Sequence, residues 1–494
     1  MRLSAIVAFL CTTLGAGVYS QPPTVTAITG GTLIDGNGGA PIADAVVVIS
    51  GAKIAAAGPR ATTAVPAGAT IIDARGKYLM PGLVDTNVHL SLYGGTGERY
   101  ETLAKYHPRQ QEIVLEAAQL QLKHGVTTVR DSYGLLAPLV AVRSQVASGA
   151  AIGPRILAAG NIVGWGGPYS ISFSLIREQG LTVFQEQVND EVSQGVGEDL
   201  VDLEPEELRA AIRAYLDKGP DFIKFGGTAH FSRPSFIGFS PEAQRAIVEE
   251  AHRRGKIAET HATTADGLRL SIDAGIDLMQ HPELLGLREL PDALVRVIVA
   301  KEVICSMLSN TISGEAWKKA VKDRDEVLAK RAEAEKTQKG TARPRTGAEL
   351  RQRAADEGLE LQMRRRNAQR LIAAGAVVTI GTDNYWAAAP EFTRGGTKPD
   401  TQNHGIGSVI AIEGLVELGM TPGQAIVAGT RNGAIAAGGL AEFGTLEAGK
   451  RADLLVLGAN PLAEISNLRT LSIVMRDGQV IDRERLPLRR VLSQ

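Results

Sequence analysis

Six residues of metal-binding or acid–base type follow short apolar segments that are spread over the chain: Asn87, His89, Lys224, His261, His281 and Asp383. Imidazole and carboxylate groups are the donors that zinc and similar divalent ions prefer in proteins. Asn87 and His89 lie two positions apart, and residues at that spacing point to the same side of a strand. The spacing therefore predicts that both side chains reach one metal ion.

Lys224 ends the apolar segment Asp221–Phe225 and is an unusual residue type in this set. An ammonium group would repel a metal cation, whereas the anionic carbamate that an amine forms with carbon dioxide would bind one and could bridge two. The structural alternative is a lysine whose stem is buried and whose charged end reaches water. The presence of His261, His281 and Asp383 in the same pattern favours the carbamate.

Four further residues are candidates for contacting a substrate: His230, Arg233, Tyr385 and His404. His230 and His404 fall in segments expected to be loops, and Arg233 or Tyr385 could anchor a free carboxylate. His230 is also a candidate for stabilising an oxyanion. Asp383 is expected to act as acid–base residue as well as metal ligand, the structural alternative being a turn or helix-cap residue.

The chain has eight apolar segments that alternate with helical patterns, which favours a parallel α/β architecture, and the six chemical residues fall at the ends of five of them. The predicted strands are Leu83–Asn87, Thr127–Arg130, Arg155–Ala159, Phe222–Phe225, Lys256–His261, Asp277–His281, Val303–Met307 and Val377–Thr382. TIM barrels carry their active sites at the carboxyl ends of the strands. An open doubly wound sheet would need a glycine-rich phosphate loop after its first strand, and the sequence has none. We therefore expect a (β/α)8 TIM barrel.

Short strands separated by Gly and Pro turns are predicted at both ends of the chain, which indicates a small β-sandwich domain built from both. We expect its two parts at residues 21–79 and 436–494, with the barrel domain at 80–435. Residues 313–366 are rich in Lys, Arg, Glu and Ala, and predict a solvated helical hairpin inserted before the eighth strand. A lid or a contact within a homo-oligomer is the alternative for this insertion.

Charge and composition narrow the class of protein. Lys and Arg total 53 against 54 Asp and Glu, so no electrostatic preference for nucleic acid or an anionic membrane is expected. Hydrophobic residues at 44% and charged residues at 22% are typical of a globular enzyme. Aromatic residues make up only 4%, which argues against a binder of single-stranded nucleic acid.

The first twenty residues predict a signal peptide, and hence a periplasmic or secreted protein without a membrane segment after cleavage. Arg2 precedes the apolar run Leu3–Val18, and small residues follow near Ser20. The run is short and contains glycine, so an uncleaved membrane anchor is the weaker alternative. Cleavage would leave Cys305 as the single cysteine and exclude an intrachain disulfide.

Taken with their neighbours, these residues resemble the amidohydrolase superfamily, in the branch of imidazolonepropionase-like and Xaa-Pro dipeptidase-like enzymes. The matching segments are Met80–His89, Gly125–Asp131, Asp221–Lys224, Glu259–His261, Gln280–Pro282, Gly381–Asp383 and the structural segment Gly449–Leu454 before Asn460 and Pro461. They extend over nearly all of the chain after about residue 25, apart from the charged insertion. The resemblance implies His89, carboxylated Lys224 and Asp383 on one metal ion, and Lys224, His261 and His281 on a second.

Two departures from the family pattern bear on the metal and the substrate. The family has His-x-His where this chain has Asn87-Val88-His89, and an amide oxygen is a poorer zinc ligand than imidazole. The number of bound Zn²⁺ ions, one or two, therefore stays open. An Asn-x-His pattern resembles the phenylurea hydrolases and favours ureas, carbamates or anilide-like amides. Gly166-Gly167-Pro168 stands where relatives often carry a histidine.

The resemblance implies a metal-dependent amidohydrolase that cleaves the C–N bond of an amide, urea or carbamate with metal-activated hydroxide. Asp383 would take the proton of the water and pass it to the leaving nitrogen. One alternative is an exported Xaa-Pro-type dipeptidase or N-acyl amino acid hydrolase. The other is a metal-poor binding protein with lost catalysis, against which the retention of Lys224, His261, His281 and Asp383 argues.

Overall fold

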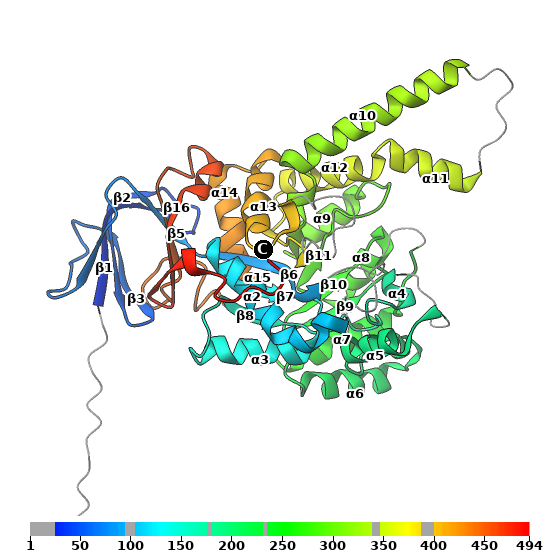
Figure 1. Cartoon of the computed structure of the whole chain (residues 1–494), viewed down its shortest axis with the longest axis horizontal. Coiled ribbons are helices and arrows are strands. Elements are labelled where there is room, and N and C mark those ends of the chain that lie inside the picture. The colour runs from blue at the N-terminus through cyan, green and yellow to red at the C-terminus, as the bar shows by residue number, and fades with distance from the viewer. Residues whose placement is uncertain are drawn as a thin grey trace, which may run out of the picture.

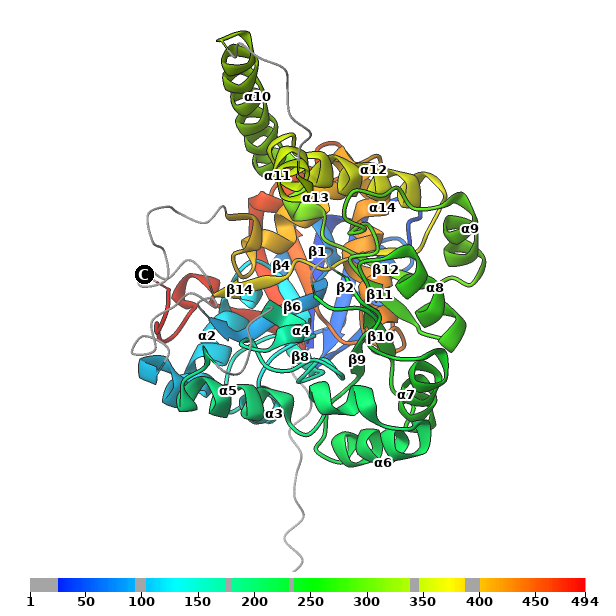
Figure 2. The same cartoon turned by 90° about the vertical axis from the view of Figure 1, so that its right-hand side faces the viewer.

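The computed structural model describes residues 25–93, 104–174, 180–230, 235–337, 346–386 and 400–493. Two parts are visible, a sheet formed by both ends of the chain and a larger α/β body from which a helical arm projects (Figures 1 and 2). Within these residues, none of the helices combines the length and the apolar character needed to cross a bilayer.

The end sheet contains eight strands and joins the two ends of the chain through the antiparallel pair β5 and β15. Its strands are β1 Val25–Leu33, β2 Ile42–Ser50, β3 Lys53–Pro59, β4 Thr70–Asp73, β5 Tyr78–Pro81, β15 Leu454–Leu457, β16 Leu471–Arg476 and β17 Gln479–Ile481. Seven lie in the order β17-β16-β15-β5-β1-β2-β3, and β4 pairs with β1. Apolar residues of both ends, such as Ile28, Val47 and Leu454, share one buried cluster. The hydrogen-bonded strands form one sheet, so the predicted two-sheet sandwich is not confirmed.

The α/β body contains parallel strands in two arcs. Its strands are β6 Leu83–Tyr93, β7 Val126–Asp131, β8 Arg155–Ala158, β9 Ile223–Gly226, β10 Ala258–His261, β11 Leu278–Gln280, β12 Ile304–Met307, β13 Val378–Ile380 and β14 Asn384–Trp386. One arc runs β9 to β13, and the other runs β14-β6-β7-β8. The chain passes from β13 directly to β14 at one junction, and a bridge from Val163 to Phe225 joins the arcs at the other. The fold is therefore an α/β fold of TIM-barrel type, as predicted, while a single closed sheet is not found among the described strands.

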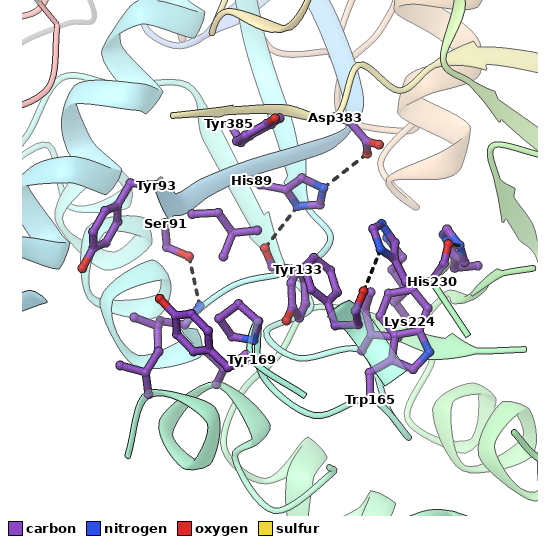
Figure 3. Close-up of a pocket in the computed structure, with 18 of the residues that line it drawn as sticks. His89, Ser91, Tyr93, Tyr133, Trp165, Tyr169, Lys224, His230, Asp383 and Tyr385 are labelled. Atoms are coloured by element: carbon purple, nitrogen blue, oxygen red, sulfur yellow. Dashed lines mark hydrogen bonds and ion pairs between the residues drawn. The ribbon is translucent and has the colours of Figure 1, made fainter. Parts of the chain in front are cut away.

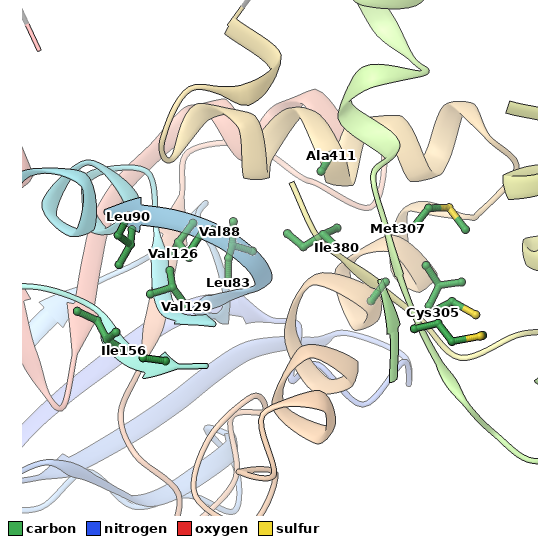
Figure 4. Close-up of a cluster of buried hydrophobic side chains, with 14 of the residues drawn as sticks. Leu83, Val88, Leu90, Val126, Val129, Ile156, Cys305, Met307, Ile380 and Ala411 are labelled. Carbon is green, nitrogen blue, oxygen red and sulfur yellow. The ribbon is translucent and has the colours of Figure 1, made fainter. Parts of the chain in front are cut away.

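Helices follow the strands and cover the outside of the body (Figure 2). They are α2 Gln110–Lys123, α3 Leu136–Ala147, α4 Ile171–Ser174, α5 Val183–Ser193, α6 Pro205–Leu216, α7 Pro241–Arg253, α8 Ala265–Ala274, α9 Asp292–Ala300, α10 Gly314–Thr337, α11 Gly347–Asp356, α12 Leu359–Ala373, α13 Ile406–Glu417, α14 Pro422–Val427 and α15 Gly433–Ala436. Gly275 ends α8 with φ +94°, a left-handed conformation that glycine adopts without steric cost. Apolar strand residues such as Val88, Val129 and Ile380 belong to the main buried cluster (Figure 4).

The charged insertion forms α10, α11 and α12, and the first two project from the body as an arm (Figure 1). Ion pairs join α10 to the end of α11. The Oε1 atom of Glu357, which follows α11, lies 3.1 Å from Nη1 of Arg331 in α10 and 2.8 Å from Nε of Arg353. At the base of the arm the Arg365 guanidinium lies 4.8 Å from the centre of the Trp317 ring.

The C-terminal residues lie against α2. The buried Glu116 carboxylate of this helix accepts hydrogen bonds from the backbone N–H groups of Val491, Leu492 and Ser493 at 2.8, 2.9 and 2.9 Å. The Ser493 hydroxyl donates to the same carboxylate. The first residue of the same helix, Gln110, lines the main cavity.

Candidate active site

A cavity of about 410 Å³ lies at the carboxyl ends of the parallel strands (Figure 3). Five of the six predicted metal-binding residues line it, and each comes from a different strand or strand end: His89, Lys224, His261, His281 and Asp383. The polar groups predicted from sequence to act together are thus gathered in one place. The volume lies within the usual range of small-molecule sites.

The Asp383 carboxylate is the centre of this group. Its Oδ1 atom lies 3.2 Å from His89 Nε2, 3.4 Å from His281 Nε2 and 2.6 Å from the Asn87 side-chain nitrogen. Burial alone would raise the pKa of Asp383, but interactions with His281, His89 and Lys224 hold it well below its usual value. The carboxylate is therefore ionised at neutral pH.

Two of the strand ends turn sharply at the chemical residue itself. His281 has φ +47° and Asp383 has φ +50°, a left-handed conformation that is uncommon for residues other than glycine. Hydrogen bonds to neighbouring strands hold both residues, from His281 N to Ser306 O at 2.9 Å and from Asp383 N to Asn87 O at 2.9 Å. Strained backbone of this kind clusters at functional sites because the surrounding structure must impose it.

Asn87 is wholly buried and does not line the cavity in the described part of the chain. Its amide oxygen accepts a hydrogen bond from the Ser132 hydroxyl, and its amide nitrogen faces Asp383 and, at 3.1 Å, His281 Nε2. Ser132, at the end of the neighbouring strand β7, thus holds the amide oxygen that was expected to bind a metal ion. The metal-ligand role of Asn87 stays a prediction.

Lys224 is only 2% exposed, and its Nζ donates a hydrogen bond to Ser132 Oγ at 3.2 Å. Burial lowers the pKa of this amine, while the nearby carboxylates of Glu259, Asp383 and Asp131 act in the opposite direction. A lowered pKa increases the fraction of unprotonated amine, which is the form that reacts with carbon dioxide.

The arrangement of protons on the histidines fits a cation at this site. His89 Nδ1 lies 3.1 Å from the Tyr133 carbonyl and His261 Nε2 lies 3.2 Å from the His230 carbonyl, so each of these nitrogens carries a proton. Metal-binding histidines show this same contact to a backbone carbonyl. His89 Nε2 then faces the Asp383 oxygen at 3.2 Å, a contact that needs either a proton or a metal cation between the two atoms.

The neighbouring His281 supplies no charge at neutral pH. Burial lowers its pKa to about 4, so the ring is neutral at pH 7, and its buried Nδ1 has no hydrogen-bond partner among the described residues. Two ligands of a tetrahedral zinc ion with bonds of ~2.0–2.1 Å lie ~3.3 Å apart, close to the distances around Asp383. Among the described residues, however, no three His, Cys, Asp or Glu side chains by themselves enclose an ion. The side chains of His89, His281 and Asp383 are therefore of the types that bind a divalent cation. A modified Lys224 would supply a further ligand and complete the site.

A layer of buried polar residues that the sequence analysis did not assign lies below the site. The Arg130 guanidinium is 2.9 Å from the Glu259 carboxylate and 3.9 Å from the centre of the Phe222 ring. Gln280 donates to Glu259 at 3.0 Å. A sequence signal existed, because charged residues inside short apolar strands need a partner when buried.

Aromatic rings form one wall of the cavity. The ring centre of Phe173 lies 4.4 Å from that of His230 and 5.0 Å from that of Tyr133, and both pairs are stacked. The ring centre of Trp165 lies 4.9 Å from that of His261. Figure 3 shows Tyr133, Trp165 and His230 at the cavity. His230 Nδ1 lies 3.0 Å from the Phe173 carbonyl, so the neutral ring presents Nε2 as an acceptor. The predicted role of His230 in stabilising an oxyanion would therefore require a protonated ring.

The remaining predicted substrate-binding residues divide into three cases. Tyr385 lines the cavity, and Arg233 lies outside the described residues. His404 was expected at the cavity but does not line it: its buried ring lies 5.0 Å from Trp386, and Gln121 lies 3.4 Å from its Nδ1. The loop turns the ring toward α2, and its role as a substrate contact stays a prediction.

Comparisons of the sequence and of the structure with known proteins point to the same family. Residues 78–481 match the Amidohydrolase family. Ochratoxinase of Aspergillus niger is 26% identical over 462 residues, which cover 89% of this chain and 82% of that protein. The crystal structure of phenylurea hydrolase B superposes with a TM-score of 0.81 and 31% identity, covering 95% of this chain and 99% of the other.

The structure of molinate hydrolase is equally similar, with a TM-score of 0.81 and 30% identity over 96% of this chain and 98% of the other. These relatives and the family match extend across both the end sheet and the body. The chain therefore belongs to the amidohydrolase family and is a hydrolase that acts on carbon–nitrogen bonds.

Proposed function

We propose that this protein hydrolyses the C–N bond of an amide, urea or carbamate, using Asp383 to move a proton from water to the leaving nitrogen. The observation that carries the proposal is the position of the Asp383 carboxylate, which lies within 3.4 Å of two imidazoles and one amide at the cavity wall. Ureas and carbamates are favoured by likeness to a phenylurea hydrolase and a molinate hydrolase, which are about 30% identical.

His89, His261, His281, Asp383 and a carboxylated Lys224 would together hold the divalent cation, with zinc the metal that these donors suit best. When bound, the cation lowers the pKa of a water molecule and polarises the substrate carbonyl. The site is proposed to hold one or two ions, and metal analysis of the purified protein measures the number per chain.

The residues of the chain supply the acid–base step. An ionised Asp383 accepts a proton from the attacking water, and the same group then donates it to the leaving nitrogen. The Asn87 amide donates to Asp383 Oδ1, which leaves the other carboxylate oxygen to exchange the proton. His89 and His261 are kept in one tautomer by the Tyr133 and His230 carbonyls.

Replacing Asp383 by Asn tests this scheme. The change keeps the size of the side chain and removes the proton acceptor, so kcat should fall by about 1000-fold or more, while the circular dichroism spectrum stays unchanged. Asp266→Asn, on an exposed carboxylate at the start of α8, is the matched control and should retain full activity. Turnover close to normal in Asp383→Asn would exclude the proposed step.

We also propose that the protein is exported, on the basis of the apolar run Leu3–Val18. These residues lie outside the described part of the chain. Mass determination of the mature protein, purified from the periplasm or medium of an expressing bacterium, tests the proposal. A mature protein that starts near Gln21 is expected, and an intact Met1 on a cytoplasmic protein would contradict it.

A further inference from the structure

The active-site cavity has two chemically different ends. One end holds the polar groups of His89, Lys224 and Asp383. The other end, here called the apolar lobe, is formed by the end of β6, by the loops after β7 and β8 and by α5. The apolar lobe is defined by Leu92, Tyr93, Leu135, Tyr169, Val188 and Val192. A substrate whose reacting bond lies at the polar end must place one of its substituents in or beside this lobe.

Aromatic residues are concentrated around the cavity. The chain has only ten Phe, nine Tyr and three Trp residues, yet six of them line this cavity: Tyr93, Tyr133, Trp165, Tyr169, Phe173 and Tyr385. The Tyr133 and Phe173 rings stack at 5.0 Å, and the Trp165 ring meets Tyr133 edge-on at 6.5 Å. Aromatic pairs favour these offset and edge-on arrangements, and a further ring can join them in the same geometry.

Charge is absent from the apolar lobe in the described part of the chain. No Lys or Arg side chain lines the cavity there except Lys224, which lies at the polar end. His107, at the edge of the lobe, is 3.1 Å from the Glu191 carboxylate. A substrate carboxylate in the lobe would therefore lose its hydration without gaining a cation, whereas an uncharged ring would lose little.

We propose that the apolar lobe binds an uncharged aryl group of the substrate. The inference rests on the proposed function and narrows it. Aryl amides, aryl ureas and aryl carbamates are substrates in this scheme, whereas dipeptides and N-acyl amino acids, whose free carboxylate finds no Lys or Arg besides Lys224 on the described cavity wall, are rejected.

A pair of substrates that differ in one charge tests the inference. N-phenylacetamide and 4-acetamidobenzoate have the same cleaved bond and the same ring, and only the second carries a carboxylate. With the wild-type protein, kcat/KM for the uncharged compound should exceed that for the carboxylate by about 100-fold. Equal values, or a preference for the carboxylate or for a dipeptide panel, would overturn the inference.

Two variants on one helix locate the effect. Val188 lines the lobe from α5, whereas Val183, five residues earlier on the same helix, is 70% exposed and is not part of the cavity wall. Val188→Arg should lower kcat/KM for N-phenylacetamide and reduce the ratio between the two substrates at least tenfold. Val183→Arg should leave both values unchanged. An unchanged ratio in Val188→Arg would show that the ring does not bind there.

Val188→Thr serves if the arginine variant does not fold, because it keeps the shape and adds only a hydroxyl. A smaller change of the ratio in the same direction is expected, and no change would count against the lobe.

Failure of the proposed function is recognised separately by calorimetry. If neither compound is hydrolysed, binding of N-phenylacetamide without binding of 4-acetamidobenzoate supports the lobe and refutes the reaction. Binding of the carboxylate alone, or of neither compound, refutes the lobe.

Discussion

Replacement of Asn87 by Asp separates two roles that this residue could have. Asp has the same shape, but it replaces the amide nitrogen, which lies 2.6 Å from Asp383 Oδ1, by an oxygen. A metal ligand would be improved by this change, because a carboxylate binds a divalent cation more strongly than an amide oxygen. A hydrogen-bond donor to Asp383 would be lost.

The structure favours the donor role, and the size of the effect follows from it. A hydrogen bond to a charged group contributes about 1.5–3 kcal/mol, which corresponds to a decrease in kcat of about 10- to 150-fold. Two carboxylates at this distance cannot both be ionised, so the introduced carboxyl group and Asp383 would share a proton. Asp383 would then be a weaker proton acceptor. We expect kcat to fall while the metal content per chain stays the same or rises.

The assay combines steady-state kinetics with metal analysis by mass spectrometry. Ser132→Ala is the matched variant: it leaves all charges unchanged and removes the hydroxyl that holds the Asn87 oxygen. A loss of at least about tenfold in kcat is expected, since the Asn87 oxygen and the Lys224 Nζ both lose a hydrogen-bond partner. If Asn87→Asp kept full kcat and bound metal more tightly, the amide would be a ligand and the donor role would be refuted.

Four further outcomes are expected. Removal of metal with a chelator should abolish activity and added Zn²⁺ should restore it; activity that survives complete removal would contradict the proposed chemistry. Lys224→Met should lose both bound metal and turnover, and added acetate should restore part of each, because a small carboxylate can replace the carbamate. Glu116→Ala should lower the free energy of unfolding by about 3 kcal/mol in denaturant titration with kcat unchanged; the reverse pattern would give Glu116 a role in the site. Arg130→Met should lower the free energy of unfolding by about 3–5 kcal/mol in the same titration, because the buried Glu259 carboxylate loses its ion pair. Adding Glu259→Gln to this variant should recover most of the lost free energy.

The strands of the body were predicted closely, for a physical reason. A strand covered on one side by helices and on the other by the strands opposite is a short apolar run with a polar residue where it meets the cavity. β8 was expected at Arg155–Ala159 and spans Arg155–Ala158. The short β14 was missed, because Asn384–Trp386 has no apolar run and pairs with β6 only through the tertiary structure.

The positions of site residues were also predictable, but their orientations were not. The direction of a loop side chain depends on which neighbours have space for it, and His404 found that space against Trp386 and α2 rather than at the cavity. Aromatic residues of the cavity wall, such as Phe173, gave no signal in the sequence. Their significance lies in packing against rings that are distant along the chain, such as Tyr133.

Asn87 shows where residue type stops being informative. An Asn side chain offers an acceptor and a donor at almost the same place, so its position beside His89 was compatible with metal binding or with hydrogen bonding. The choice is made by Ser132, which is 45 residues away and donates to the oxygen. With that oxygen hydrogen-bonded to Ser132, the NH₂ group faces Asp383, which is why we propose that Asn87 positions the acid–base carboxylate, while its role as a metal ligand stays a prediction.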